Sequence, residues 1–298
     1  MRHLLGIEDL DVEEVRQILD LASLHAEGQQ CRFDSTWCLG LLFLSSSLRT
    51  RLGFSVAATR SGATVVHIDA LRFTTEMSDG ESLDDTIRTA SGMLDMLVMR
   101  TPFQLERDVV AAQARCPVIN AGDGLGGHPT QALIDVFAME RLRGPIRDLR
   151  IGILGDASTR VASSLFALLT RLEPVEIRVM TPAERSLPAA LRRPGYTRAI
   201  TITEETPLDG LDVVYLTGFP ALEGPFAMDA QRRHQYQLDP ARISTLPAEA
   251  IVLSPLPVID EIERSVRDDP RVLMFEASDL SIYVRQAVLG FLRTVNQS

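Results

Sequence analysis

The chain has 298 residues and a formal net charge of −10, and every one of its 30 Lys+Arg residues is arginine. Without lysine, the chain has no residue that can form a Schiff base and no P-loop lysine for nucleotide phosphates. The acidic balance and the lack of a basic run exclude the electrostatic footprint of a nucleic-acid-binding protein. No stretch approaches the roughly 20 consecutive apolar residues of a transmembrane helix, so no membrane association is predicted.

The length exceeds what one compact hydrophobic core usually supports, and it therefore predicts two domains. The first 20 residues mix acidic side chains into a helical pattern and lack the apolar core of a signal peptide, which predicts a cytoplasmic protein. Cys31, Cys38 and Cys116 are odd in number and have no C-x-x-C spacing. They indicate neither a disulfide framework nor a zinc site, and reduced thiols fit the same compartment.

The hydrophobic pattern predicts alternating strands and helices. Apolar residues spaced for one helical face predict a helix over residues 9–25, and the apolar run at 37–44 predicts a buried strand. Further strands are predicted at residues 64–68, 96–99, 117–120, 150–154, 176–180, 213–216 and 251–253. Helical stretches separate these strands, which favours an α/β fold with parallel sheets. The strands are continuously apolar, as expected for sheets that helices cover on both faces.

A break in this series predicts the domain boundary. A helix predicted at 129–141 is followed by Gly144 and Pro145, and a new strand–helix series begins at Leu149. We therefore expect two α/β domains, residues 1–138 and 145–278, each with a parallel sheet flanked by helices. The last helix, residues 279–296, is long enough to pack back on the first domain.

The strongest local signal is a candidate anion site directly after the strand that ends at Leu44. Serines precede Arg49 and Thr50 where the next helix opens, and a serine is a common helix cap. A helix start offers free backbone N–H groups and the positive end of the helix dipole, and arginine adds a guanidinium that can bind an anion through two hydrogen bonds. The structural alternative is a serine-capped helix with solvent-facing arginines. Arg100 ends another strand, and the carboxyl ends of parallel strands are where open α/β sheets bind ligands.

A glycine-rich segment, residues 120–131, follows a strand and opens a helix. It contains G-x-G-x-x-G, which admits a dinucleotide-binding interpretation. That interpretation also needs an acidic residue about 20 positions further on, and Asp156 lies farther away. His128, at the start of the helix, is expected to stay neutral and to donate one hydrogen bond to a substrate oxygen. A buried histidine with a purely structural hydrogen bond is the alternative.

Four motifs occur in a characteristic order. They are Ser-Leu-Arg-Thr-Arg at 47–51, Met-Arg-Thr-Pro at 99–102, His-Pro-Thr-Gln at 128–131 and Pro-Leu-Pro at 255–257. Together they resemble the aspartate and ornithine carbamoyltransferase family, and more closely its aspartate branch, which typically shows Ser-Thr-Arg-Thr-Arg, His-Pro-Thr-Gln and His-Pro-Leu-Pro. The resemblance extends along nearly the whole chain.

The resemblance implies a site for carbamoyl phosphate and the chemistry of carbamoyl transfer. The implied donor-site residues are Ser47, Arg49, Thr50, Arg100, His128, Gln131, Pro255 and Leu256. Of these, Arg49, Thr50, Arg100 and His128 are the implied catalytic residues. Attack by an amine places negative charge on the carbamoyl oxygen, and fixed donors from Thr50, Arg100 and His128 would act as an oxyanion hole. The resemblance implies no metal and no organic cofactor.

The chain departs from the family pattern mainly on the acceptor side. Arg160 matches one acceptor-binding arginine, but Gly218 stands where the aspartate branch has the other, and Ser254 replaces the histidine of His-Pro-Leu-Pro. The family's mobile-loop lysine aligns with Asp79. Removing a charge partner from a desolvated site typically costs about 2 to 5 kcal/mol. We therefore expect aspartate, which carries two carboxylates, to bind less efficiently than in the family.

Three hypotheses follow. The first is an active carbamoyltransferase that uses carbamoyl phosphate and a small amine or amino-acid acceptor. The family default is aspartate to N-carbamoylaspartate in pyrimidine biosynthesis, with the acceptor open to change. The second is a catalytically weak or inactive structural or regulatory homologue that keeps carbamoyl phosphate binding. The third is an NAD-dependent oxidoreductase. The resemblance also implies a homotrimer whose active sites are shared through residues 73–79.

Overall fold

The computed structural model describes residues 1–29, 32–68, 82–188, 191, 199–219 and 228–297. Asp79 and the expected shared segment at 73–79 lie outside the described residues. The chain divides into two compact units. Unit 1 comprises Met1–Ile134 and Leu280–Ser298, and unit 2 comprises Asp135–Asp279. The domain limits expected from the sequence, 1–138 and 145–278 with the last helix at 279–296, stay a prediction.

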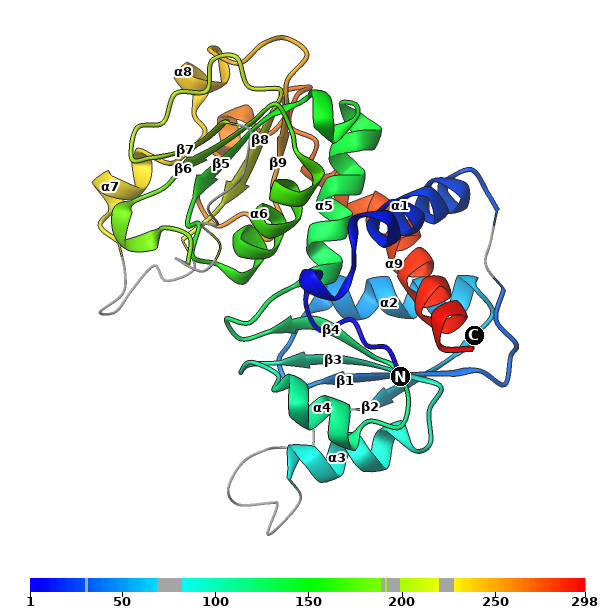
Figure 1. The fold of residues 1–298 in the computed structure, drawn as a ribbon. Coiled ribbons are helices and arrows are strands. Elements are labelled where there is room, and N and C mark those ends of the chain that lie inside the picture. Colours follow the sequence, from blue (N-terminus) through cyan, green and yellow to red (C-terminus); the bar gives the residue numbers. More distant parts are fainter. Residues whose placement is uncertain (30–31, 69–81, 189–190, 192–198, 220–227, 298) are drawn as a thin grey trace. The chain divides into compact units, whose positions relative to one another are not determined.

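Unit 1 contains a four-stranded parallel sheet with the order β2-β1-β3-β4. The strands are β1 (Cys38–Phe43), β2 (Thr64–Ile68), β3 (Met96–Thr101) and β4 (Val118–Asp123). The helices are α1 (Val12–Ala26), α2 (Leu48–Arg60), α3 (Leu83–Ser91), α4 (Arg107–Gln113), the start of α5 (Pro129–Leu142) and most of α9 (Met274–Gln297). Helices α3 and α4 cover one face of the sheet, and α1, α2 and α9 lie on the other (Figure 1). The strand order reverses between β1 and β3, so these two strands flank a topological switch point.

The first helix starts later than its hydrophobic pattern predicts. Residues Ile7–Asp9 form a short 3-10 turn, η1, and α1 begins only at Val12. Asp11 accepts a hydrogen bond from the Glu14 amide at 2.8 Å, and the Glu14 side chain accepts one from the Asp11 amide at 2.9 Å. This capping box satisfies two backbone donors at once and therefore sets the start of the helix.

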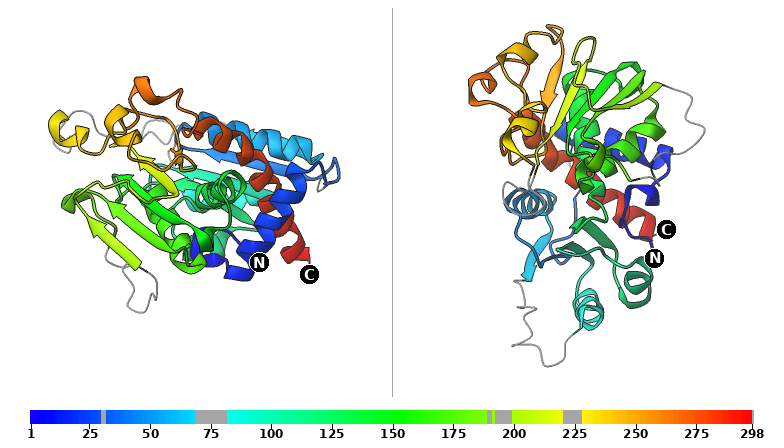
Figure 2. Two further views of the ribbon diagram at one scale, coloured as in Figure 1. Left: turned by 90° about the horizontal axis from the view of Figure 1, so that it is seen from above. Right: turned by 90° about the vertical axis from the view of Figure 1, so that its left-hand side faces the viewer.

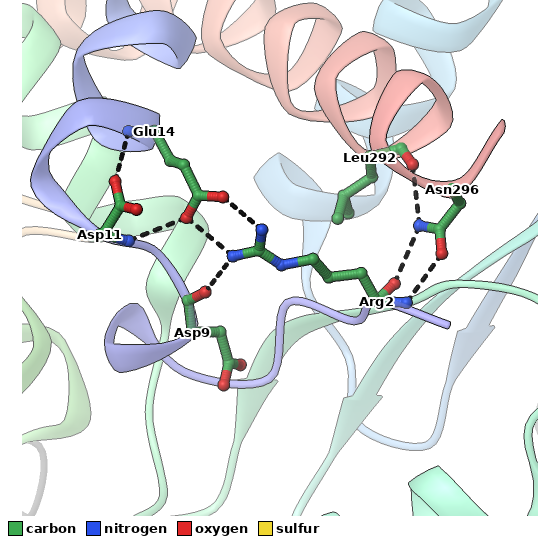
Figure 3. Close-up of polar contacts among 6 residues, drawn as sticks. All are labelled: Arg2, Asp9, Asp11, Glu14, Leu292 and Asn296. Atoms are coloured by element: carbon green, nitrogen blue, oxygen red, sulfur yellow. Dashed lines mark hydrogen bonds and ion pairs between the residues drawn. The ribbon is translucent and has the colours of Figure 1, made fainter. Parts of the chain in front are cut away.

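The two ends of the chain meet within unit 1 (Figures 2 and 3). The Arg2 amide donates to Asn296 Oδ1 at 2.7 Å, and Asn296 Nδ2 donates back to the Arg2 carbonyl at 3.0 Å. The Arg2 guanidinium pairs with Glu14 and donates to the Asp9 carbonyl at 2.7 Å. The amino-terminal segment thus ties α1 to the carboxyl end of α9.

Unit 2 contains a five-stranded parallel sheet with the order β7-β6-β5-β8-β9. The strands are β5 (Arg150–Gly155), β6 (Glu176–Met180), β7 (Ala199–Thr203), β8 (Val213–Thr217) and β9 (Ile251–Leu253). The helices are the rest of α5, α6 (Arg160–Leu172), α7 (Ala230–His234), α8 (Pro240–Ile243) and the start of α9, with the 3-10 turns η2 (Ile146–Asp148), η3 (Ala183–Arg185) and η5 (Arg264–Val266). The switch point here lies between β5 and β8.

The two parallel sheets with flanking helices confirm the predicted fold class. Strand β7 was not predicted, because this edge strand alternates Ile and Thr and is largely exposed, unlike the continuously apolar inner strands. Val214 and Leu216 of β8 pack into a buried cluster on one face of the second sheet, and Val213 and Tyr215 point to the other.

Helix α9 begins at Met274, five residues before the predicted start at 279. Among the helices that the structure describes, none is long and apolar enough to span a membrane.

A buried hydrogen bond fastens α5 to the second sheet. The Tyr215 hydroxyl donates to Asp135 Oδ2 at 2.6 Å, and both side chains are buried. Burial, followed by the neighbouring Asp135 carboxylate, raises the pKa of Tyr215 well above its ordinary value. The hydroxyl therefore stays protonated and remains a donor to this carboxylate.

Replacing Tyr215 with phenylalanine is expected to lower the free energy of unfolding by about 1 to 3 kcal/mol, because it removes a buried hydrogen bond to a carboxylate. Urea denaturation measures this change. The matched control is Tyr236→Phe, which is also buried but whose hydroxyl donates to a neutral backbone carbonyl, that of Glu204, at 3.3 Å. We expect a smaller loss there. An equal loss in both variants would show that the hydrogen bond to Asp135 stabilises the fold no more than a hydrogen bond to a backbone carbonyl does.

Candidate functional site

The carboxyl ends of three neighbouring parallel strands carry the residues predicted for the donor site. Helix α2 follows β1 with Ser47 as its N-cap, Arg100 lies at the end of β3, and His128 follows β4. Strands β1, β3 and β4 are adjacent in the sheet. The fold therefore brings three segments that are far apart in the sequence to one sheet edge, beside the switch point where α/β sheets bind ligands.

The start of α2 has the features of an anion site. Ser47 is in the extended conformation, with φ −159° and ψ 108°, and its side chain makes no capping hydrogen bond to a described residue. Thr50 is buried, with 5% of its surface exposed. Arg49 is exposed at this helix start, and desolvation by neighbouring protein atoms lowers the pKa of its guanidinium. A cation beside the positive end of a helix favours a negatively charged ligand.

Arg100 is held in place by the neighbouring strands. Its Nη1 donates to the Ala121 carbonyl of β4 at 2.9 Å, and its own carbonyl accepts from the Leu44 amide at 2.8 Å. The register pairs Arg100 with Phe43 at the end of β1. The backbone on both sides of β3 therefore fixes this arginine near the start of α2.

The glycine-rich segment folds around an acidic side chain that the sequence analysis did not single out. Asp123 is buried and accepts hydrogen bonds from the Gly127 amide at 2.6 Å and from the Leu105 amide at 2.8 Å. A Cβ placed at Gly126 would lie only 2.6 Å from the Asp123 carboxylate, so a larger residue would not fit this turn. The loop thus directs its Gly127 amide at its own carboxylate rather than at a dinucleotide phosphate. An acidic residue within the glycine run was the signal that could have revealed this role.

His128 and Gln131 open α5 directly after this loop. His128 is 4% exposed, its Nδ1 lies 3.4 Å from Thr130 Oγ1, and its carbonyl accepts from the Gln131 amide at 3.0 Å. Gln131 is half-buried. The turn anchored by Asp123 therefore determines where the imidazole and the glutamine enter this edge of the first sheet.

In unit 2, two positions on the acceptor side and the last two implied donor-site residues gather at one sheet edge. Arg160 opens α6 after β5, Gly218 follows β8, and Pro255 and Leu256 follow β9. These three strands are adjacent. The Thr159 side chain accepts from the Ala162 amide at 3.3 Å and caps the helix that carries Arg160.

The backbone after β9 adopts an unusual conformation. Leu256 has φ 53°, in the left-handed region, which β-carbon-bearing residues seldom occupy. The Leu256 amide donates to Ser254 Oγ at 3.3 Å, so the serine that replaces the family's histidine supports this turn. Strained backbone of this kind is concentrated at ligand sites.

A buried carboxylate, Glu261, fills the space beside Gly218. It is 3% exposed and accepts hydrogen bonds from the Ile259 amide at 2.8 Å, the Asp260 amide at 3.2 Å and the Ser254 hydroxyl at 3.3 Å. A Cβ placed at Gly218 would lie 2.5 Å from Glu261 Oε2. Burial raises the pKa of Glu261, and hydrogen bonds, including one from its own backbone amide, offset part of that rise. The sequence analysis did not single out Glu261, since no local pattern distinguishes it.

Comparison with known proteins gives a consistent result. Residues 2–141 match the carbamoyl-P binding domain of the aspartate/ornithine carbamoyltransferases, and residues 147–292 match their Asp/Orn binding domain. The chain belongs to the aspartate/ornithine carbamoyltransferase family. It is 32% identical over 303 residues to the aspartate carbamoyltransferase catalytic subunit of Methanococcus maripaludis, with 98% of both chains covered.

Two solved structures are similar to this carbamoyltransferase over nearly its whole length. The catalytic subunit of M. jannaschii aspartate transcarbamoylase has a TM-score of 0.87 and 31% identity, with both chains fully covered. Aspartate transcarbamoylase from Trypanosoma cruzi, crystallised in complex with carbamoyl phosphate and aspartate, has a TM-score of 0.84 and 28% identity, with 97% of this chain and 94% of that chain covered. The family inferred from the four motifs is confirmed, and the chain is a carbamoyltransferase.

Proposed function

We propose that this carbamoyltransferase transfers the carbamoyl group of carbamoyl phosphate to the amine of a small amino acid. The observation that carries the proposal is the convergence of the α2 start, Arg100 and His128 at the carboxyl ends of β1, β3 and β4. One edge of unit 1 thus offers two guanidinium groups, a helix start and an imidazole. This set of donors suits a ligand that carries both a phosphate and a polarised carbonyl.

The reaction follows from this arrangement. The acceptor amine attacks the carbonyl carbon, so a C–N bond forms and negative charge develops on the carbonyl oxygen. Thr50, Arg100 and His128 are the proposed donors to that oxygen, and such preorganised donors stabilise the transition state more than the ground state. The C–O bond to phosphate then breaks, phosphate leaves with its electron pair, and the amine loses a proton.

The remaining assignments place both substrates. We propose that Ser47 and Arg49 bind the phosphate and that Gln131, with the main-chain carbonyls of Pro255 and Leu256, holds the carbamoyl amine. Arg160 is the proposed partner of the acceptor's α-carboxylate, because a guanidinium binds a carboxylate through two parallel hydrogen bonds. The names of the relatives make aspartate the first acceptor to test, and with aspartate the product would be N-carbamoylaspartate of pyrimidine biosynthesis.

A second candidate function rests on the residues around the acceptor. Gly218 supplies no charge, and the neighbouring side chain is the carboxylate of Glu261. Asp79 stands where the family has a lysine, so this chain carries a negative charge at a position where its relatives carry a positive one. These features favour either a changed acceptor or a weakly active homologue that keeps carbamoyl phosphate binding. The homotrimer implied by the resemblance stays a prediction.

Phosphate release from carbamoyl phosphate, measured with a panel of amino acids that starts with aspartate and asparagine, tests the proposal. We expect release with at least one acceptor and saturable binding of carbamoyl phosphate by calorimetry. Binding without release for any acceptor would favour the inactive homologue. If carbamoyl phosphate did not bind at all, the donor-site assignment itself would be wrong.

A further inference from the structure

Arg285, on the part of α9 that belongs to unit 1, is a buried cation with no carboxylate paired to it among the residues that the structure describes. It is 2% exposed. Its Nη1 donates to the Ser281 carbonyl at 3.1 Å, and its guanidinium lies 5.5 Å from the centre of the Phe54 ring. Its Nε has no hydrogen-bond partner, and none of the described carboxylates forms an ion pair with it. Because a buried charge is costly unless it is paired, this arginine calls for an anion nearby.

The side chain lies against the helix whose first turn forms the proposed phosphate site. A Cβ placed at Gly53 of α2 would come within 2.6 to 2.9 Å of the Arg285 guanidinium, so glycine at this position makes room for it. Gln286 Nε2 donates to Ser61 Oγ at 3.2 Å, just after the other end of α2. Together these contacts fix the register of α9 along α2.

The charge of Arg285 also acts on the charge of Arg49. Burial, followed by repulsion from Arg49, lowers the pKa of Arg285 to about 10. The guanidinium is still protonated at neutral pH, and the two arginines therefore raise the positive potential around the start of α2. The repulsion between these two cations, one of them fully buried, destabilises the free protein. A bound phosphate dianion would attract both cations and offset that repulsion.

We propose that Arg285 is a positioning residue for the donor substrate. Its buried positive charge strengthens binding of the phosphate at the start of α2 without touching it. The inference rests on the proposed function, since it assumes that phosphate binds beside Arg49. It predicts that the charge of Arg285, more than its shape, determines phosphate affinity.

The test compares Arg285→Met with wild type by calorimetric titration of inorganic phosphate and of carbamoyl phosphate. We expect affinity for both to fall by about tenfold, the scale set by a charge interaction at protein-like dielectric. Arg285→Lys keeps the charge and should retain most of the affinity. The free Arg285→Met protein should melt at the same temperature as wild type or higher, because an apolar side chain of similar length replaces a buried unpaired charge. A merely structural role would instead lower the melting temperature and leave phosphate affinity unchanged.

Arg293→Met is the matched control. Arg293 lies on the same helix, sits 5.0 Å from the centre of the Phe33 ring and donates to the Arg32 carbonyl at 3.1 Å, so it makes the same two kinds of contact. It is only partly buried, and phosphate affinity should not change. If Arg285→Met does not fold, Gly53→Ala decides the question, because it displaces the guanidinium and keeps the charge count; a loss of phosphate affinity is then expected.

The possible outcomes separate the inference from the proposed function. If wild type binds neither phosphate nor carbamoyl phosphate, the proposed function fails. If wild type binds both and Arg285→Met, or Gly53→Ala in its place, binds within twofold of wild type, only the role of Arg285 is refuted. In steady-state kinetics the same role predicts a raised KM for carbamoyl phosphate with a smaller change in kcat.

Discussion

Replacing Arg49 with alanine is expected to weaken the binding of carbamoyl phosphate and of inorganic phosphate by about a hundredfold or more. The guanidinium stands at the start of α2 and is exposed to a ligand there, and a bound phosphate would remove it from water. Truncating one partner of a hydrogen-bonded charge pair in such a site costs about 2 to 5 kcal/mol. Arg49→Lys keeps the charge but loses the planar fork, so an intermediate loss of about tenfold is expected. Calorimetric titration with either ligand measures all three proteins.

The control for this prediction is Arg60→Ala. Arg60 is the exposed last residue of the same helix, so the variant removes the same charge from the opposite end of the dipole. The field of a helix end falls off within about one turn, and phosphate binding should therefore stay unchanged. Equal losses in the two variants would mean that net charge, and not a site at the start of α2, governs binding. Wild-type affinity in Arg49→Ala would remove the donor-site assignment altogether.

The second large effect concerns the choice of acceptor. Asparagine has the shape of aspartate without the side-chain charge, so the ratio of kcat/KM for the two measures how strongly the protein recognises the second carboxylate. A complete charge clamp is worth about 2 to 5 kcal/mol, or roughly 30-fold to several thousandfold. With glycine at 218 and the Glu261 carboxylate beside it, we expect a ratio below about tenfold.

Glu261→Gln should shift that ratio toward aspartate by about tenfold, because it removes a buried negative charge and keeps a hydrogen-bonding side chain of the same size. Glu249→Gln is the matched control: it removes one charge from an exposed position in the same unit and should leave the ratio unchanged. A wild-type ratio in the thousands would show that another cation replaces the missing arginine. An unaltered ratio in Glu261→Gln would show that this carboxylate does not face the acceptor.

The amino-acid sequence by itself determined the fold class and the donor half of the candidate site. Continuous apolar runs of strand length, separated by amphipathic helices, specify parallel sheets covered on both faces. Each donor motif lies within one local strand–loop–helix unit, and the carboxyl ends of neighbouring parallel strands must share one edge. Ser47, Arg100 and His128 therefore reach the same edge once the strand order is set.

Only the tertiary structure decided which distant side chains meet. Arg285 comes to lie against Gly53, and Glu261 occupies the space beside Gly218, because helices and loops pack where volume and polar groups are complementary. Hydrophobic periodicity shows which face of an element is buried but does not identify the residue opposite it. The sequence shows that position 218 carries no charge. Only the packing of unit 2 shows that a carboxylate, Glu261, lies beside it, and only the packing of unit 1 shows that Arg285 is buried near the proposed phosphate site.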